Sequence, residues 1–284
     1  MAGNPQVALV TGASSGMGKA IARALLASGR KVYVAARSAD RLADLAEAGA
    51  VPVEFDLADG DAIERAVARI TGEGRLDILV NNAGFGLYGS VEDTSPADAL
   101  GQFQVNLFGP ARLTQLLLPT MRAQRSGWIV VISSMGGRIY TPLGAWYHAS
   151  KHALEGWSDC LRLEVAPFGI RVVVVEPGII DTGFGDLLID PMLRRSTGGP
   201  YAPLAGHVAA ATRASYAPGR GSDPEVVARA VRRAVGTDRP RTRYVVGKYA
   251  RTLITLRRLV GDRLFDRIIL SQVGVRSRPK QGWR

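Results

Sequence analysis

The sequence predicts an α/β fold with a doubly wound parallel sheet and helices on both faces. Short apolar runs rich in β-branched residues alternate with longer segments of helical period through the first two thirds of the 284 residues. Most runs are apolar at successive positions rather than at alternate ones, as expected for strands buried on both faces of a parallel sheet. Right-handed crossovers would place the intervening helices on both sides of it. With 46% apolar and 21% charged residues, the chain is expected to form one large domain.

The expected elements follow in order along residues 1–247, which we interpret as the catalytic domain. Strands are predicted at Val7–Val10, Lys31–Ala35, Val51–Phe55, Ile78–Val80, Trp128–Ile132, Arg171–Val175 and Arg243–Val246. Helices are predicted at Met17–Ser28, Asp61–Thr71, Asp98–Ala123 and Tyr147–Ala166.

Two later segments depart from this alternation. Residues 183–223 are rich in Gly, Pro and Ala and weakly periodic, which predicts a substrate lid, either loop or helical flap, before the last strand. Residues 248–284 form a basic extension in which apolar residues recur at helical spacing. These residues are Leu253, Leu256, Val260, Leu264 and Ile268, with Phe265 beside the stripe. Gly261 weakens the prediction of one unbroken helix. We expect the extension to dock on the domain, with contact to an anionic membrane surface as the alternative.

Charge and cysteine content limit the function classes. The net charge is +11, but residues 241–284 carry twelve Lys and Arg against two Asp, so the rest of the chain is nearly neutral. This distribution argues against nucleic acid as a partner. The single cysteine, Cys160, cannot form an internal disulfide and is expected to pack within a helix. Neither a signal peptide nor a membrane-spanning run is evident, so we expect a cytoplasmic protein, peripheral to a membrane at most.

A glycine-rich turn follows the first predicted strand and opens the first helix. It reads Thr11-Gly12-Ala13-Ser14-Ser15-Gly16-Met17-Gly18. Gly12 permits a sharp turn, Gly16 lets the backbone approach a pyrophosphate, and Gly18 allows close packing of helix and strand. The helix N-terminus adds N–H donors and a favourable dipole. In this context we interpret residues 12–18, including Ser14, Ser15 and Met17, as a dinucleotide site of Rossmann type rather than a plain turn.

The end of the second predicted strand bears on the choice of cofactor. It reads Ala35-Ala36-Arg37-Ser38 and lacks the acidic residue that would bind the ribose 2′-hydroxyl of NAD. Arg37 can pair with a 2′-phosphate, which favours NADP(H). A solvated surface arginine is the alternative.

Tyr147 and Lys151 are one helical turn apart at the start of a predicted helix. A tyrosine hydroxyl, with a pKa near ~10, is a poor base unless a neighbouring charge stabilises the phenolate, and an ammonium one turn away would do so. Ser134 ends a strand thirteen residues before Tyr147, and Asn106 lies in a predicted helix. His148 is expected to be partly exposed and without a role in proton transfer. Because no residue cluster has metal-ligand spacing, no metal is expected.

Together these motifs resemble the short-chain dehydrogenase/reductase family over residues 6–182. The residues that carry the resemblance are the turn from Thr11 to Gly18, Asp56, Asn81 to Gly84, Asn106, Ser134, Tyr147, Lys151, Pro177-Gly178 and Thr182. The segment from Tyr147 to Pro177 is similar to the branch that contains hydroxysteroid and retinol dehydrogenases.

The resemblance implies a role for each matched residue. Ser134 would polarise the substrate oxygen, Tyr147 would be the acid/base, Lys151 would lower the tyrosine's pKa and bind the nicotinamide ribose, and Asn106 would hold a relay water. The resemblance also implies cofactor contacts. Asp56 and Leu57 would contact the adenine, and Asn82, Ala83 and Gly84 would lie along the cofactor. Pro177 and Gly178 would also contact the cofactor, with Ile180 and Thr182 at the nicotinamide carboxamide. Asn81 is interpreted as structural.

The sequence thus predicts an NADP(H)-dependent oxidoreductase that interconverts a carbonyl and a secondary alcohol on a bulky apolar, steroid- or retinoid-like substrate. A 3-oxoacyl-carrier-protein reductase is the alternative enzyme, and a non-catalytic NADP-binding regulator or scaffold is the alternative from another class. The family resemblance also implies a homodimer or homotetramer formed through the helices at Asp98–Ala123 and Tyr147–Ala166.

Overall fold

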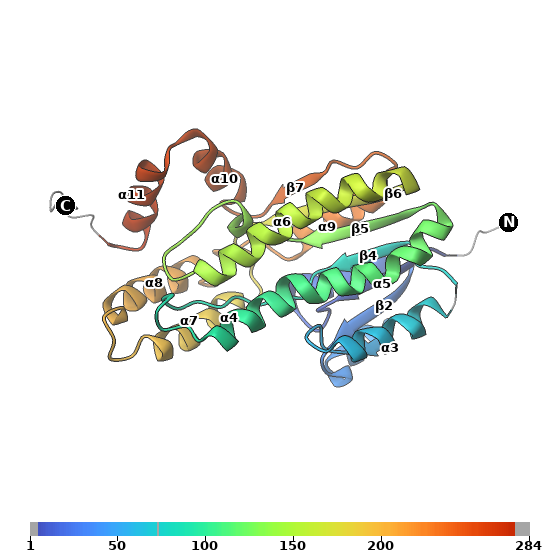
Figure 1. Cartoon of the computed structure of the whole chain (residues 1–284), viewed down its shortest axis with the longest axis horizontal. Helices are drawn as coiled ribbons and strands as arrows, with labels where there is room; N and C mark the ends of the chain where they lie inside the picture. The colour runs from blue at the N-terminus through green and yellow to red at the C-terminus, as the bar shows by residue number, and fades with distance from the viewer. Residues whose placement is uncertain (1–4, 73, 276–284) are drawn as a thin grey trace.

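The computed structural model describes residues 5–72 and 74–275, and a seven-stranded parallel sheet lies at its centre (Figure 1). The strand order is β3-β2-β1-β4-β5-β6-β7. The strands are β1 (Val7–Thr11), β2 (Lys31–Ala36), β3 (Val51–Glu54), β4 (Ile78–Asn81), β5 (Gly127–Ile132), β6 (Ile170–Pro177) and β7 (Arg243–Val246). The predicted parallel sheet is confirmed, with every strand end within two residues of its expected position.

The order of the strands determines where a site can form. The chain runs outward from β1 to β3, then returns to add β4 on the other side of β1, so the direction of winding switches between β1 and β4. In such sheets ligands bind at this switch, outside the carboxyl ends of the strands. The glycine-rich turn, Asn82, Ser134 and Gly178 all follow strand ends at this edge.

Helices cover both faces of the sheet. The cluster on one face includes residues of α1 (Gly16–Leu26) and α9 (Glu225–Val235), while the other includes α3 (Gly60–Thr71), α5 (Gly109–Gln124) and α6 (Ala145–Val165). Short helical turns are η1 (Ala39–Leu42), α2 (Ala43–Glu47), η3 (Met135–Gly137) and η4 (Ala166–Phe168). Sequence periodicity missed α2, which is five residues long, and α9, whose buried face is built largely of alanine and valine.

The predicted helix at Asp98–Ala123 is helical throughout but is not a regular α-helix along its whole length. It consists of α4 (Pro96–Phe103), a π-helical turn η2 (Gln104–Phe108) and α5. Such π turns are frequent at functional sites, and this one contains Asn106.

The predicted lid is a pair of helices. α7 (Phe184–Arg195) and α8 (Ala202–Ser215) pack together over an apolar cluster that also includes Leu143. Leu143 has a left-handed backbone (φ 63°), an uncommon conformation for this residue type, and its side chain is buried among the lid residues.

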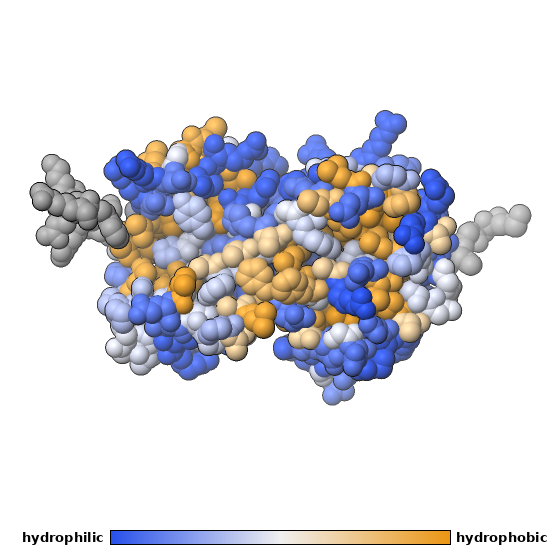
Figure 2. Space-filling model, in the orientation of Figure 1, coloured by the Kyte–Doolittle hydropathy of each residue, from blue (hydrophilic) through white to orange (hydrophobic). Residues whose placement is uncertain are grey.

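The extension docks through only part of the predicted stripe. Leu253, Leu256 and Val260 pack against the apolar cluster as expected, but the second half of the stripe does not. Extended backbone at Val260 and Gly261 separates α10 (Ala250–Leu259) from α11 (Asp262–Gln272), which resets the helical phase. Phe265 and Ile269 are therefore buried against Ile139, whereas Leu264, expected in the stripe, is 50% exposed. Figure 2 shows apolar atoms at the outer corner of the extension, amid hydrophilic surface.

Two further observations concern the described part of the chain. Cys160 is exposed on α6, so the prediction that it packs inside was wrong. Between residues 5 and 275, leaving out residue 73, no helix has the length and apolar character needed to cross a membrane.

Candidate active site

The glycine-rich turn has a backbone that only glycine suits. Gly12 and Gly16 are left-handed, with φ of 65° and 52°. A Cβ on Gly18 would lie 2.2 Å from the carbonyl oxygen of Gly12, so α1 and β1 could not approach so closely with any other residue there. Ser15 precedes α1 without forming a side-chain cap, so the first N–H groups of the helix are left for another acceptor. This arrangement fits a pyrophosphate of a dinucleotide.

The segment after β4 braces this turn. Asn82 Nδ2 donates to the carbonyl oxygens of Thr11 (2.8 Å) and Gly12 (3.2 Å), and the backbone N–H of Ala83 donates to Thr11 Oγ1 (3.1 Å). Gly84 leaves the chain close to Asn106, because a Cβ there would lie 3.0 Å from Asn106 Oδ1. Asn81 is buried and donates to Thr114 Oγ1, in keeping with a structural role.

The residues expected to contact the adenosine half lie at neighbouring strand ends. Arg37 directly follows β2 and is exposed, and no hydrogen bond or ion pair within the described residues engages its guanidinium. Asp56 follows β3, and its Oδ1 accepts a hydrogen bond from the backbone of Ala58 (2.9 Å). Leu57 is buried beside it.

Ser134, Tyr147 and Lys151 line one cavity near the carboxyl end of β5. The Ser134 hydroxyl accepts from the backbone N–H of Gly136 (3.0 Å) and lies within hydrogen-bonding reach of the Tyr147 hydroxyl. Burial raises the pKa of Tyr147 well above its ordinary value, although the contact with Ser134 opposes the shift. Lys151 Nζ donates to the carbonyl oxygen of Ile132 (3.0 Å), and burial lowers the pKa of Lys151 to about 8. The chain alone therefore holds a neutral phenol beside a lysine that ionises near neutral pH.

Asn106 ties the segment after β4 to α6. Its Nδ2 donates to Phe85 O (3.0 Å) and Ser150 Oγ (3.1 Å), while its Oδ1 accepts from Phe85 N (3.1 Å). Both amide hydrogens are used, so a water would bind the remaining lone pair of Oδ1 or the main chain.

His148 was wrongly predicted to be partly exposed. It is 6% exposed, its Nδ1 lies 2.8 Å from Gly136 O, and its Nε2 accepts from the backbone N–H of Thr141 (3.1 Å). An Nε2 that accepts leaves the proton on Nδ1, which then donates to Gly136. Burial lowers the pKa of His148 to about 4. The neutral ring thus clamps the loop that carries Ser134.

One cavity joins these groups. Of the predicted residues, it is lined by Met17, Asn82, Gly84, Ser134, Tyr147, Lys151, Pro177, Gly178, Ile180 and Thr182. Gly12, Ser14, Ser15, Gly16, Gly18, Arg37, Asp56, Leu57, Ala83 and Asn106 lie outside its lining, along the same edge of the sheet or packed behind it.

Sequence reasoning missed the aromatic side of this cavity. Phe184 of α7 and Tyr216, just after α8, line it, and the rings of Tyr147 and Phe184 are 6.0 Å apart. Tyr88 also lies close to Tyr147, with ring centroids 5.9 Å apart. Isolated aromatic residues in the Gly- and Ala-rich lid segment were the available signal.

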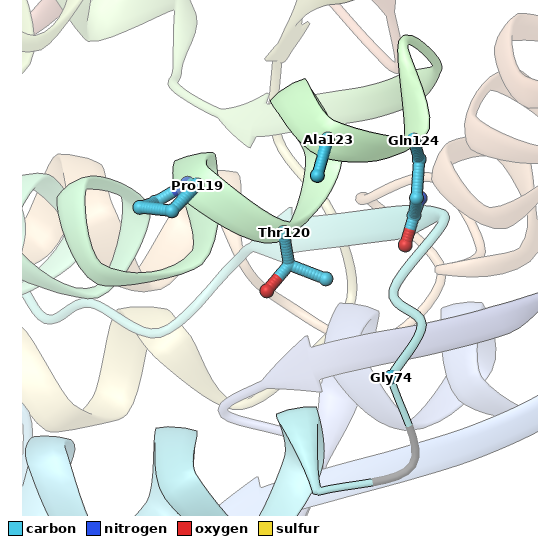
Figure 3. A pocket seen from close by; sticks show the side chains of 5 residues that line it. All are labelled: Gly74, Pro119, Thr120, Ala123 and Gln124. Carbon is cyan, nitrogen blue, oxygen red and sulfur yellow. The ribbon is translucent and has the colours of Figure 1, made fainter.

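A second hollow lies elsewhere, beside the loop that leads into β4 (Figure 3). Its lining is Gly74, Pro119, Thr120, Ala123 and Gln124, none of which is titratable. The amide of Gln124 is already bonded to both backbone groups of Leu76. This hollow has no evident chemistry.

Comparison with known proteins identifies the family. A family model described as short chain dehydrogenase matches residues 6–190. The chain is 36% identical over 287 residues to Dehydrogenase/reductase SDR family member 7B of Xenopus laevis. This alignment covers 96% of this chain and 84% of the relative. It is 40% identical over 182 residues to the 3-ketodihydrosphingosine reductase of Bacteroides thetaiotaomicron, covering 64% of this chain and 66% of that one.

Solved structures agree. A short-chain dehydrogenase from Streptomyces avermitilis superposes with a TM-score of 0.78 at 35% identity, covering 96% of this chain and 98% of the other. A metagenomic short-chain oxidoreductase in complex with NADP gives 0.66 at 30% identity, over 85% and 96%. The chain belongs to the short chain dehydrogenase family and is an oxidoreductase that uses a nicotinamide cofactor.

Proposed function

We propose that this enzyme interconverts a carbonyl and a secondary alcohol with NADP(H), acting on a bulky apolar substrate. The observation that carries the proposal is the convergence of Ser134, Tyr147 and Lys151 in one cavity beside a glycine-rich turn. A nucleotide-binding regulator would have no use for all three groups, so catalysis is favoured over that alternative.

The roles of the catalytic residues follow from their protonation and contacts. When bound, a nicotinamide would supply a hydride to the carbonyl carbon or accept one from the alcohol. Ser134 would donate a hydrogen bond to the substrate oxygen, and Tyr147, kept neutral by burial, would transfer its proton to that oxygen during reduction. Lys151 would stabilise the phenolate that remains and bind a ribose, and Asn106 would hold a water of the proton relay.

The nucleotide would extend along the strand ends. Gly12, Ser14, Ser15, Gly16, Met17 and Gly18 would hold the pyrophosphate, Asp56 and Leu57 the adenine, Asn82, Ala83 and Gly84 the central part, and Pro177, Gly178, Ile180 and Thr182 the nicotinamide. Arg37 is exposed and without a protein partner in the described chain, as a residue that binds a 2′-phosphate would be. The NADP in the metagenomic relative supports the same preference.

The lining of the cavity supports an apolar substrate. Phe184, Tyr216, Phe85 and Ile132 contribute aromatic and aliphatic surface around Tyr147. Such walls suit a steroid- or retinoid-like ketone or alcohol, and a relative named 3-ketodihydrosphingosine reductase adds a long-chain ketone as a comparable candidate. A 3-oxoacyl-carrier-protein substrate is the alternative.

A substrate screen with either nicotinamide cofactor tests the proposal. Bulky ketones and alcohols, a long-chain 3-ketone and a 3-oxoacyl-carrier protein would each be followed at the nicotinamide absorbance. We expect turnover of a bulky apolar compound with NADPH or NADP⁺. Turnover of the carrier-protein substrate alone would select the alternative enzyme. NADPH binding with no turnover of any compound would contradict the proposed reaction.

We further propose a cytoplasmic homodimer or homotetramer formed through the helical segment from α4 to α5 and through α6. Phe108, which immediately precedes α5, and Leu163 on α6 are 49% and 68% exposed, so both apolar side chains are accessible to a second subunit. Light scattering after size-exclusion chromatography would give the mass. A monomer at micromolar concentration would contradict this proposal.

We propose that the extension acts by docking rather than by membrane binding, because Phe265 is fully buried. Sedimentation with anionic liposomes at low and high salt would compare the full chain with one truncated after Gly247. Salt-sensitive binding lost on truncation would overturn the docking-only view.

A further inference from the structure

Two buried carboxyl groups lie directly behind the catalytic residues. Glu155 of α6 is 3% exposed and Glu176 of β6 is 1% exposed. The two carboxyls are within hydrogen-bonding reach of one another, and burial, reinforced by Glu155, raises the pKa of Glu176 to about 7. Carboxyls are rarely buried without a strong reason, because removing their charge from water is costly.

Two arginines partly offset these charges. Arg243 of β7 contacts Glu155 Oε2 through Nη2 (3.0 Å) and Glu176 Oε1 through Nε (3.2 Å), and also binds Asp159 (2.7 Å). Arg138, which follows η3, contacts Glu176 Oε1 (3.2 Å). The second oxygen of Glu155, Oε1, has no hydrogen-bond donor among the described residues.

The cluster is joined to the catalytic groups through Glu155. This residue is one helical turn after Lys151, on the same buried side of α6. A Cβ on Gly137 would lie 3.0 Å from Glu155 Cγ and 3.1 Å from Lys151 O, so the loop that carries Ser134 rests on this turn of the helix. Lys151 Nζ has only a carbonyl partner and no ion pair within the described chain, and Glu155 is the acidic group that raises its pKa against the effect of burial.

We propose that Glu155 is a positioning residue that keeps the Lys151 ammonium charged, and that Glu176, Arg138 and Arg243 set how much negative charge Glu155 presents to it. The inference rests on the proposed role of Lys151 in the reaction. An opposite charge close to a buried lysine favours its protonated form. In the absence of Glu155, burial alone would act on Lys151, and the ammonium would lose its proton at lower pH.

The five lysines of the chain make a direct test practical. Protein labelled with ¹³C at lysine Cε would be titrated by NMR without cofactor, and the Lys151 signal would be assigned with Lys151→Arg. In the wild type we expect one midpoint well below the others. Glu155→Gln should shift that midpoint to lower pH, since removing a nearby opposite charge disfavours the charged form of a buried lysine. Glu164→Gln, an exposed glutamate on the same helix, is the matched control and should leave it unchanged.

Folding of the variant is expected, because Arg243 keeps Asp159 and Glu176 as partners. If Glu155→Gln fails to fold, Glu155→Met removes the same charge with an apolar side chain of similar length and is expected to give the same shift. An unchanged or higher midpoint in a folded variant would overturn the inference.

Turnover assays give a second measurement. The pH at which kcat/KM declines on the alkaline side should be lower in Glu155→Gln, in step with the lower NMR midpoint. A wild type without carbonyl reductase activity would overturn the proposed function and leave the NMR result as a separate test of the charge coupling.

Discussion

The nucleotide-binding part of the chain, up to Thr182, and the lid and extension that follow it are organised by different constraints. In the first part the backbone itself is specified, since Gly12, Gly16 and Gly18 occupy positions where a side chain would be strained or would collide. In the second part helices α7, α8, α10 and α11 are held by apolar contacts that many residues satisfy. Where the chemistry needs a particular residue, the sequence shows a recognisable motif. Where only apolar packing is needed, many sequences satisfy it and no motif is seen.

The largest expected effect is at Tyr147. Tyr147→Phe should lower kcat by about 10²–10⁴, the usual contribution of general acid–base catalysis, and leave NADPH affinity nearly unchanged because only the hydroxyl is removed. Tyr88→Phe, which alters the neighbouring ring 5.9 Å away, is the control and should keep most activity. A Tyr147→Phe enzyme within tenfold of wild type would refute the assignment.

The corresponding change in the second part is Phe265→Ala. Truncating a fully buried phenylalanine should lower the free energy of unfolding by about 3–5 kcal/mol, or detach the extension and expose it to protease. Thermal unfolding and limited proteolysis would report either outcome. Leu264→Ala, at an exposed position next to it, should change stability by no more than about 0.5 kcal/mol. Equal effects of the two substitutions would show that the extension is not docked through Phe265.

His148 acts where the two parts meet, because it holds Gly136 and Thr141 of the loop that leads to Leu143, and Leu143 packs against the lid helices. Its pKa is lowered by burial to about 4, so between pH 6.5 and 4 the unfolded chain binds more protons than the folded one. Stability should therefore fall as pH falls through this window, by up to about 3 kcal/mol from this residue. His148→Asn should flatten that part of the pH dependence in denaturant unfolding, whereas His152→Asn, at an exposed position, should not. If the free energy of unfolding depends on pH in the same way for wild type and His148→Asn, His148 does not hold the loop as described.

The smallest effect concerns cofactor choice at Arg37. Arg37→Asp removes a charge-assisted pair worth about 1.5–3 kcal/mol and adds a group that repels phosphate, so the ratio of kcat/KM for NADPH over NADH should fall roughly tenfold or more. Arg65→Asp, on the exposed side of α3, is the control. An unaltered coenzyme ratio would mean that Arg37 only faces solvent.

The sequence was informative about the strands, and all seven were predicted to within two residues, including the partly exposed edge strands β3 and β7. The spacing of Tyr147 and Lys151 indicated that these two residues share a helix face, and the family resemblance added Ser134 to them. The sequence did not indicate the burial of His148, because that depends on the path of the loop at residues 136–141 rather than on helical spacing. The register of α11 was also missed, since the break at Val260 and Gly261 shifts which residues face inward.

The placement of β7 has a consequence for synthesis of the chain. β6 lies between β5 and β7, but β7 is translated only after both lid helices. Until then, a nascent or prematurely terminated chain presents Val174–Pro177, the residues that pair with β7, as an open strand edge with unpaired backbone groups. Such an edge can pair with a neighbouring chain, so a premature stop within the lid is expected to yield aggregates rather than a smaller enzyme.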